Sequence, residues 1–232
     1  MKPALSDVER IAIHIPVGKV HVAADLSLPQ DATGLVLFAH GSGSSRHSPR
    51  NRHVAEVLNR GSIGTILADL LTEDEEAVDL QTAELRFDID LLTRRLIGIT
   101  DWIGGQGTLN RLRLGYFGAS TGAAAALAAA AERPDVVRAV VSRGGRPDLA
   151  GPSLSGVTAP CLFIVGADDP VVLRLNREAI AELPEQTAWK LEIVPGATHL
   201  FEEPGTLDRV SELARDWFRQ HLAVRSARME AR

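Results

Sequence analysis

The sequence predicts an α/β fold built on a mostly parallel, twisted β-sheet with helices on both faces. Short apolar runs of strand length alternate with segments of helical periodicity along nearly the whole chain, as in repeated strand–helix–strand units. Most of these runs are apolar throughout, which is expected of strands covered on both faces. The first two runs instead alternate partially and flank a turn at Val17-Gly18-Lys19, which predicts an antiparallel pair preceding the parallel strands.

About eight strands and five helices are expected, and right-handed crossovers should place the helices on both faces of the sheet. Strands are predicted at 11–15, 20–28, 35–39, 64–68, 112–117, 137–141, 161–165 and 189–194, and helices at 52–59, 87–103, 121–132, 173–182 and 207–222. The acidic stretch from Thr72 to Glu84 is interpreted as a solvated loop after the fourth strand. The segment 142–159 has room for a short turn or helix and not for a cap domain.

The 232 residues are predicted to form a single domain over 1–224, followed by a charged tail at 225–232. The formal net charge of −5 and the 4% of aromatic residues argue against a nucleic-acid partner, which would need a basic stripe and bases stacked on rings. No run of about 18 apolar residues predicts a membrane span, and the first residues do not read as an export signal. One cysteine, Cys161, fits a reducing compartment, so a cytoplasmic protein is expected.

The strongest functional signal is Gly118-Ala119-Ser120-Thr121-Gly122, which lies between a predicted strand and an alanine-rich predicted helix. A tight strand-to-helix turn raises the serine hydroxyl above the sheet edge, and the flanking glycines allow the close backbone approach that such a turn needs. The helix also directs its positive end toward a developing oxyanion. Ser120 is therefore the candidate nucleophile.

A serine nucleophile needs a base and an acid, and on this architecture they follow it in the order acid, then histidine. The strand at 161–165 ends in two adjacent carboxylates, Asp168 and Asp169, at the edge where sites of α/β sheets form. His199 follows the last predicted strand, and the one other histidine after Ser120, His221, falls in the terminal helix. His199 is the candidate base, and the position of the acid is open between the two aspartates.

These three motifs resemble those of the α/β-hydrolases, and nearly the whole chain is similar to the dienelactone-hydrolase-like group. The resemblance implies a catalytic triad of Ser120, Asp169 and His199, because in relatives the acid follows the strand-end glycine by three positions and precedes a proline. It also implies an oxyanion loop at His40-Gly41-Ser42-Gly43, with the main-chain N–H groups of Ser42 (less favourably Gly43) and Thr121 as donors.

The resemblance implies a hydrolase that acts on small soluble carboxylic esters or lactones through an acyl-enzyme, with no cofactor and no metal. Dienelactone hydrolases proper carry a cysteine nucleophile, so Ser120 favours general ester hydrolysis. Two alternatives use the same sequence features: a thioesterase or acyltransferase with the same triad, and a non-catalytic binding module of the hydrolase fold.

Several basic residues lie near the predicted site. Arg143 and Arg146 leave the strand at 137–141 on the active-site edge and are candidates to pair with a substrate carboxylate, although salt bridges to local acids explain them better. A dinucleotide-binding motif at Gly41-x-Gly43 is disfavoured, because Arg46 occupies the third glycine position.

Overall fold

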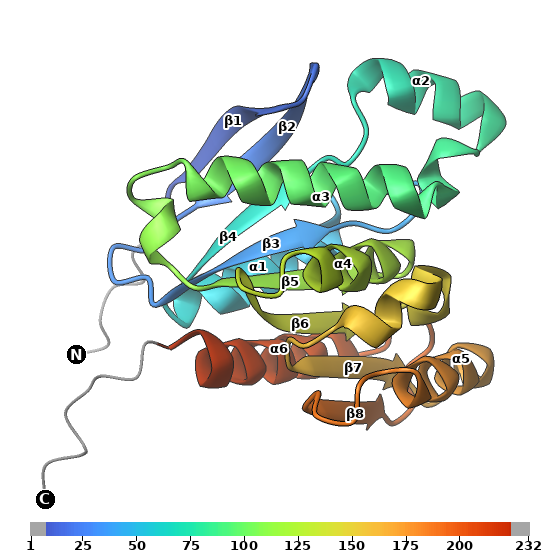
Figure 1. Cartoon of the computed structure of the whole chain (residues 1–232). Coiled ribbons are helices and arrows are strands. Elements are labelled where there is room, and N and C mark those ends of the chain that lie inside the picture. Colours follow the sequence, from blue (N-terminus) through green and yellow to red (C-terminus); the bar gives the residue numbers. More distant parts are fainter. Residues whose placement is uncertain (1–7, 224–232) are drawn as a thin grey trace, which may run out of the picture.

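One eight-stranded sheet organises residues 8–223, the part of the chain that the computed structural model describes. The strand order is β1-β2-β4-β3-β5-β6-β7-β8 (Figure 1). Strands β3 to β8 are parallel, whereas β1 pairs with β2 and β2 pairs with β4 in antiparallel fashion. The strand bounds are β1 Arg10–Val17, β2 Val20–Ser27, β3 Gly34–Ala39, β4 Ile63–Ala68, β5 Leu114–Ala119, β6 Val137–Arg143, β7 Cys161–Gly166 and β8 Trp189–Val194. The predicted mostly parallel sheet with an antiparallel edge is confirmed.

Helices cover both faces of the sheet, and two apolar layers fill the spaces between them and the strands (Figure 1). Helices α1 and α6 pack on one face, and α3 and α4 pack on the other. The α-helices are α1 Pro49–Arg60, α2 Glu73–Thr82, α3 Ile89–Gly104, α4 Thr121–Glu132, α5 Pro170–Ala181 and α6 Thr206–Leu222. Short 3₁₀ segments lie at η1 Leu85–Phe87, η2 Leu109–Arg111 and η3 Pro147–Gly156.

The acidic stretch that was predicted to be a loop is instead mostly helix α2, which projects beyond the sheet in Figure 1. Thr72 caps its first turn, with the Thr72 hydroxyl accepting from the N–H of Glu75 and the Glu75 carboxylate accepting from the N–H of Thr72. Acidic side chains in the first turn also favour the positive end of the helix dipole. The prediction was wrong because α2 has almost no buried face, so it shows no apolar periodicity.

The segment between β6 and β7 contains only η3 and a kink at Gly151, and no cap domain lies there.

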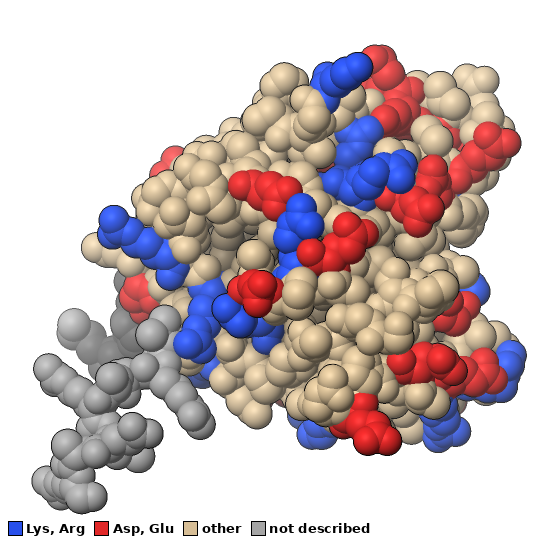
Figure 2. All heavy atoms as spheres, in the orientation of Figure 1, with Lys and Arg blue, Asp and Glu red and all other residues tan. Residues whose placement is uncertain are grey.

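On the face shown in Figure 2, acidic and basic side chains are interspersed, and acidic ones gather over α2. No helix within 8–223 is long and apolar enough to cross a bilayer. The predicted tail at 225–232 lies outside the described residues.

A buried hydrogen bond connects α3 to the strand that carries the candidate nucleophile. The hydroxyls of Tyr116 in β5 and Thr100 in α3 lie 2.6 Å apart, and both side chains are buried. Burial raises the pKa of the Tyr116 phenol, so the group stays protonated and able to donate. This contact fixes the helix over the centre of the sheet.

We expect Tyr116→Phe to lower the free energy of unfolding by about 1–2 kcal/mol, because the Thr100 hydroxyl loses its partner in an apolar layer. Urea unfolding of the single and double variants measures this. The double variant Tyr116→Phe/Thr100→Val should recover part of the loss. A double variant as destabilised as the sum of the two single variants would contradict a direct bond between the hydroxyls.

Candidate active site

Ser120 occupies a strained turn between β5 and α4. Its backbone has φ +50° and ψ −122°, a conformation that L-residues rarely adopt. A side chain at either flanking glycine would collide with backbone: a Cβ on Gly118 would lie 2.4 Å from Cα of Ala123, and one on Gly122 would lie 2.3 Å from the carbonyl oxygen of Ala39. The turn therefore requires both glycines of the motif, and it raises Ser120 at the carboxyl edge of the sheet.

His199 and Asp169 meet at the same edge, from two other loops. Asp169 follows β7 and His199 follows β8, and His199 Nδ1 lies 2.7 Å from Asp169 Oδ2. The Asp169 side chain also caps α5 by accepting from the N–H of Val172 at 3.4 Å. Asp168 lies exposed in the turn before it and makes no side-chain hydrogen bond among the described residues. Of the two candidate acids, only Asp169 is paired with the imidazole.

The loop that carries His199 is held by its own contacts. Phe201 is 1% exposed within the layer under α6, and Thr198 donates its N–H and its hydroxyl to Glu203 at 3.2 and 2.5 Å. These bonds lower the pKa of Glu203, so the carboxylate remains an acceptor at neutral pH. The imidazole thus projects from a braced turn.

The predicted oxyanion loop lies beside the serine. Within residues 8–223 the N–H groups of Ser42 and Thr121 meet no backbone or side-chain acceptor, so both remain able to donate. The tight approach of Gly122 to Ala39 places the start of α4 against the start of this loop. Both implied donors are thereby placed near the candidate nucleophile.

His40 fastens the loop to the neighbouring strand. Its Nδ1 lies 3.0 Å from the carbonyl oxygen of Gly41, and Nε2 accepts from the N–H of Leu70 at 3.0 Å. The neutral ring therefore carries its proton on Nδ1. Burial lowers the pKa of His40, which keeps the ring neutral.

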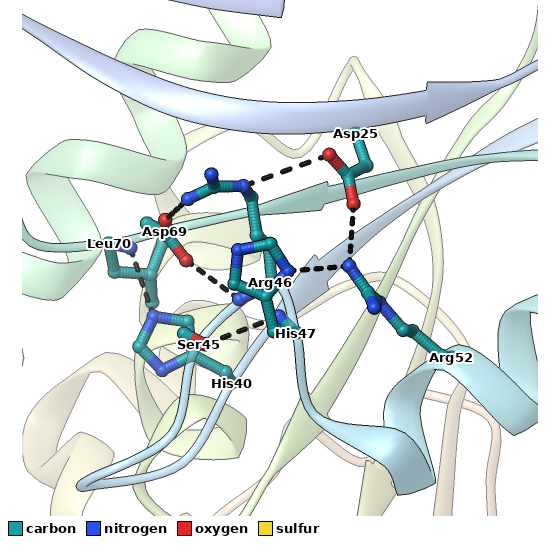
Figure 3. A network of polar contacts seen from close by, with 8 residues as sticks. All are labelled: Asp25, His40, Ser45, Arg46, His47, Arg52, Asp69 and Leu70. Atoms are coloured by element: carbon teal, nitrogen blue, oxygen red, sulfur yellow. Dashed lines mark hydrogen bonds and ion pairs between the residues drawn. The ribbon is translucent and has the colours of Figure 1, made fainter. Parts of the chain in front are cut away.

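Ion pairs hold the other end of the loop (Figure 3). The guanidinium of Arg46 contacts Asp69 and lies 3.7 Å from Asp25, and the backbone N–H of Arg46 donates to Asp69 Oδ1 at 2.7 Å. Arg52 reaches Asp25 at 3.1 Å and His47 at 2.5 Å. Asp69, which a dinucleotide-binding unit would use for a ribose, is thus occupied by Arg46, consistent with the rejection of that motif.

A cavity of about 230 Å³ connects these elements. It is lined by Gly41, Ser42, Ser44, Ser48, Arg50, Asn51, Ala119, Ser120, Arg143, His199 and Leu200. Of the two candidate arginines, Arg143 lines the cavity, whereas Arg146 pairs with Asp148 at 2.8 and 2.9 Å and does not.

Sequence reasoning did not single out Arg50 or Asn51 as residues of the site. The signal for both was Ser48-Pro49, because Ser48 caps α1 and Pro49 occupies its first turn, which starts the helix earlier than predicted.

The remaining reactive groups take no part in this cavity. Cys161 is 1% exposed within β7, and burial raises the pKa of its thiol to about 12, so the group stays protonated. No group of three or more His, Cys, Asp or Glu side chains in the described part of the chain could hold a metal ion. His221 stacks on Trp217 with ring centroids 4.4 Å apart.

Residues 72–223 match the family model described as "Dienelactone hydrolase family". A crystal structure of a dienelactone hydrolase from Anabaena variabilis is 55% identical, with a TM-score of 0.90 over 93% of this chain and 99% of that one. Est1E from Butyrivibrio proteoclasticus is 16% identical, with a TM-score of 0.74 over 90% of this chain and 98% of that one, and so supports the fold alone.

Two Mycobacterium tuberculosis proteins, one from each of two strains, are 56% identical over 220 residues and are provisionally named phosphoribosyl transferases. The match covers 95% of this chain and 48% of theirs, so the chain spans about half the length of these relatives.

Because the pKa of His40 is lowered in the folded state, the unfolded chain takes up the proton first as the pH falls. The stability that His40 contributes is therefore full above the ordinary value of about 6.5 and is lost as the pH decreases below it. Between pH 7 and pH 5, the free energy of unfolding should therefore fall by up to about 2 kcal/mol more in the unaltered protein than in His40→Gln, which has no titrating group at this position. Denaturant unfolding at both values measures it.

The exposed His21→Gln in β2 is the matched control and should lose as much stability as the unaltered chain. An equal loss in His40→Gln and His21→Gln would show that the loop contact is not the titrating element.

Proposed function

Since the chain belongs to the dienelactone hydrolase family, a family of α/β-hydrolases, we propose that it is a serine hydrolase that cleaves small carboxylic esters or lactones through an acyl-enzyme. The observation that carries the proposal is a strained Ser120 at the same cavity as an imidazole already paired with a carboxylate, His199 Nδ1 to Asp169 Oδ2 at 2.7 Å. An unpaired serine hydroxyl would be a poor nucleophile, and the paired imidazole supplies the base.

In the proposed reaction, His199 Nε2 takes the proton of the Ser120 hydroxyl as Oγ attacks the carbonyl carbon. The tetrahedral oxyanion accepts hydrogen bonds from the N–H groups of Ser42 and Thr121, each worth about 3 kcal/mol in the transition state. The imidazolium gives the proton to the departing alkoxide, and the Ser120 ester remains. Water then attacks the carbonyl carbon of the acyl-enzyme while His199 takes its proton. The carboxylic acid is released as the imidazolium returns that proton to Ser120. Asp169 holds the Nδ1–H tautomer and stabilises the imidazolium.

The size and openness of the site favour small substrates. The cavity of about 230 Å³ is not covered by a cap, because the β6–β7 connection holds only η3. A long acyl chain would therefore remain in water and gain little from burial.

For this chain we propose hydrolysis rather than phosphoribosyl transfer, the activity in the provisional name of the Mycobacterium tuberculosis relatives. The shared segment is the one that carries the hydrolase family match, and their provisional name applies to a protein of about twice this length.

We expect Ser120→Ala and His199→Ala each to lower kcat for a 4-nitrophenyl acetate-type ester by a factor of roughly 10⁴ or more, with the melting temperature nearly unchanged. A fluorophosphonate probe should label the unaltered protein and not Ser120→Ala. Turnover that survives both substitutions would overturn the proposal, and absence of labelling would favour a binding module. Thioester and lactone counterparts of the same acyl group separate esterase from thioesterase activity.

The two adjacent aspartates provide a matched pair. We expect Asp169→Asn to lower kcat roughly 10³- to 10⁴-fold, because an amide favours the wrong imidazole tautomer. Asparagine caps a helix as well as aspartate does, so α5 should remain intact. Asp168→Asn, one residue away, should leave kcat within about twofold, because the Asp168 side chain makes no hydrogen bond within residues 8–223. Steady-state kinetics of both variants decide which acid serves the histidine, and equal losses would refute the choice of Asp169.

A further inference from the structure

Strand β8 is an edge of the sheet (Figure 1). It pairs in parallel with β7, and no other strand of residues 8–223 lies on its outer side. Strand β1, at the opposite edge, carries Pro16, whereas β8 contains no proline. Proline lacks an N–H and is one of the features that keep an exposed edge from pairing with another chain. The β8 edge lacks this protection.

The apolar side chains of β8 are incompletely covered. Trp189 and Ile193 are 52% and 39% exposed, and Leu191 between them packs on the apolar layer of the α3–α4 face. Because side chains alternate along a strand, these three form an apolar row on one face, and Lys190 and Glu192 lie on the other. The Lys190 ammonium and the Glu192 carboxylate lie 2.5 Å apart. The edge thus presents an apolar row on one face and two opposite charges on the other.

The backbone of β8 shows which groups point away from the sheet. The carbonyl oxygens of Ala188 and Val194 accept from N–H groups at the two ends of β7, each at 2.9 Å, so both face β7. Since backbone groups alternate in direction along a strand, those of Lys190 and Glu192 also face β7. The N–H and C=O groups of the apolar row therefore face the free edge, where a further strand can pair with them.

We infer that β8 pairs with β8 of a second copy of this chain, antiparallel about a twofold axis at Leu191, so that the two sheets join into one. In this register Leu191 lies opposite Leu191 of the second copy, and Trp189 lies opposite its Ile193. These are the residues whose N–H and C=O groups point outward, so each such pair exchanges two hydrogen bonds. An aromatic and a β-branched side chain then cover each other on the apolar face.

Charge selects this register over its neighbours. Pairing about Leu191 places Lys190 opposite Glu192 of the second copy at both ends of the interface, in the pairs where side chains approach most closely. Registers centred on Lys190 or on Glu192 would also bring outward backbone groups together. They would, however, set two lysines or two glutamates directly opposite each other, which is destabilising. The strand is therefore complementary to itself in one register.

The dimer should be weak and concentration dependent, because one strand pair buries less than the roughly 1,600 Å² of a standard stable interface. We expect sedimentation velocity to show a monomer near about 1 µM and mostly dimer near about 300 µM, with a dissociation constant on the order of 10 µM. This measurement requires no substrate, so its outcome is independent of the proposed hydrolysis.

Charge reversal tests the register. Lys190→Glu and Glu192→Lys each set like charges opposite one another in the homodimer, so we expect each to weaken association at least about tenfold. The double variant Lys190→Glu/Glu192→Lys restores opposite pairs and should associate like the unaltered protein. An equimolar mixture of the two single variants should form a heterodimer, since an acidic strand then faces a basic one.

The matched control is Lys19→Glu, which makes the same change of charge in the exposed turn between β1 and β2. It should leave the dissociation constant within about twofold. A chain that stays monomeric at about 300 µM overturns the inference and leaves this edge to a strand of another protein. A dimer that neither reversal weakens, or single variants that fail to associate when mixed although each melts like the unaltered protein, also overturns it.

Hydrogen exchange checks the direction of the backbone groups. At equal high concentration, the N–H of Leu191 should exchange more slowly in the unaltered protein than in the monomeric Glu192→Lys, whereas the N–H of Lys190, already directed at β7, should exchange at the same rate. A dimer in which Leu191 gains no protection would place the interface elsewhere and overturn the inference.

Discussion

The site depends on one unfavourable backbone conformation, the left-handed turn at Ser120. Such a conformation costs of order 1–3 kcal/mol and persists only when its surroundings determine it. Here both backbone groups of Ser120 are tied to the neighbouring strand β6 and the loop after it: the Ser120 N–H donates to the carbonyl of Arg143 at 3.3 Å, and the Ser120 carbonyl accepts from the N–H of Arg146 at 3.0 Å. The pairing of β5 with β6 therefore fixes the candidate nucleophile as well as the sheet.

The antiparallel edge of the sheet also supports the site. Asp25 in β2 and Asp69 after β4 together hold Arg46, and Asp25 holds Arg52 at the start of α1 (Figure 3). These ion pairs fix the far end of the loop that supplies Ser42, while His40 fixes its near end. Pairs between partly buried residues are screened less than surface pairs, so they can restrain a polar loop that has few apolar contacts. The hairpin and the end of β4 thus stabilise the predicted oxyanion loop.

Local chemistry explains what the sequence could and could not predict. Six parallel strands and the turn at Ser120 follow from apolar runs and from a short glycine motif, both of which can be interpreted within a few residues. Helix α2 was missed because its stability comes from capping and dipole interactions rather than from an apolar stripe. The choice of Asp169 over Asp168 came from the family resemblance, and spacing alone left it open. The different positions of Arg143, which lines the cavity, and Arg146, which pairs with Asp148, depend on how the whole fold places the two side chains, which no local pattern contains.

The open cavity and the buried Arg143 side chain lie together at the end of β6. A hydrolase without a cap buries little of a small substrate, so apolar contact contributes little to either affinity or discrimination. Specificity in such a site depends on a few directional polar contacts. Arg143 contributes both to the wall of the cavity and to the position of the candidate nucleophile, because its carbonyl oxygen accepts from the Ser120 N–H at 3.3 Å.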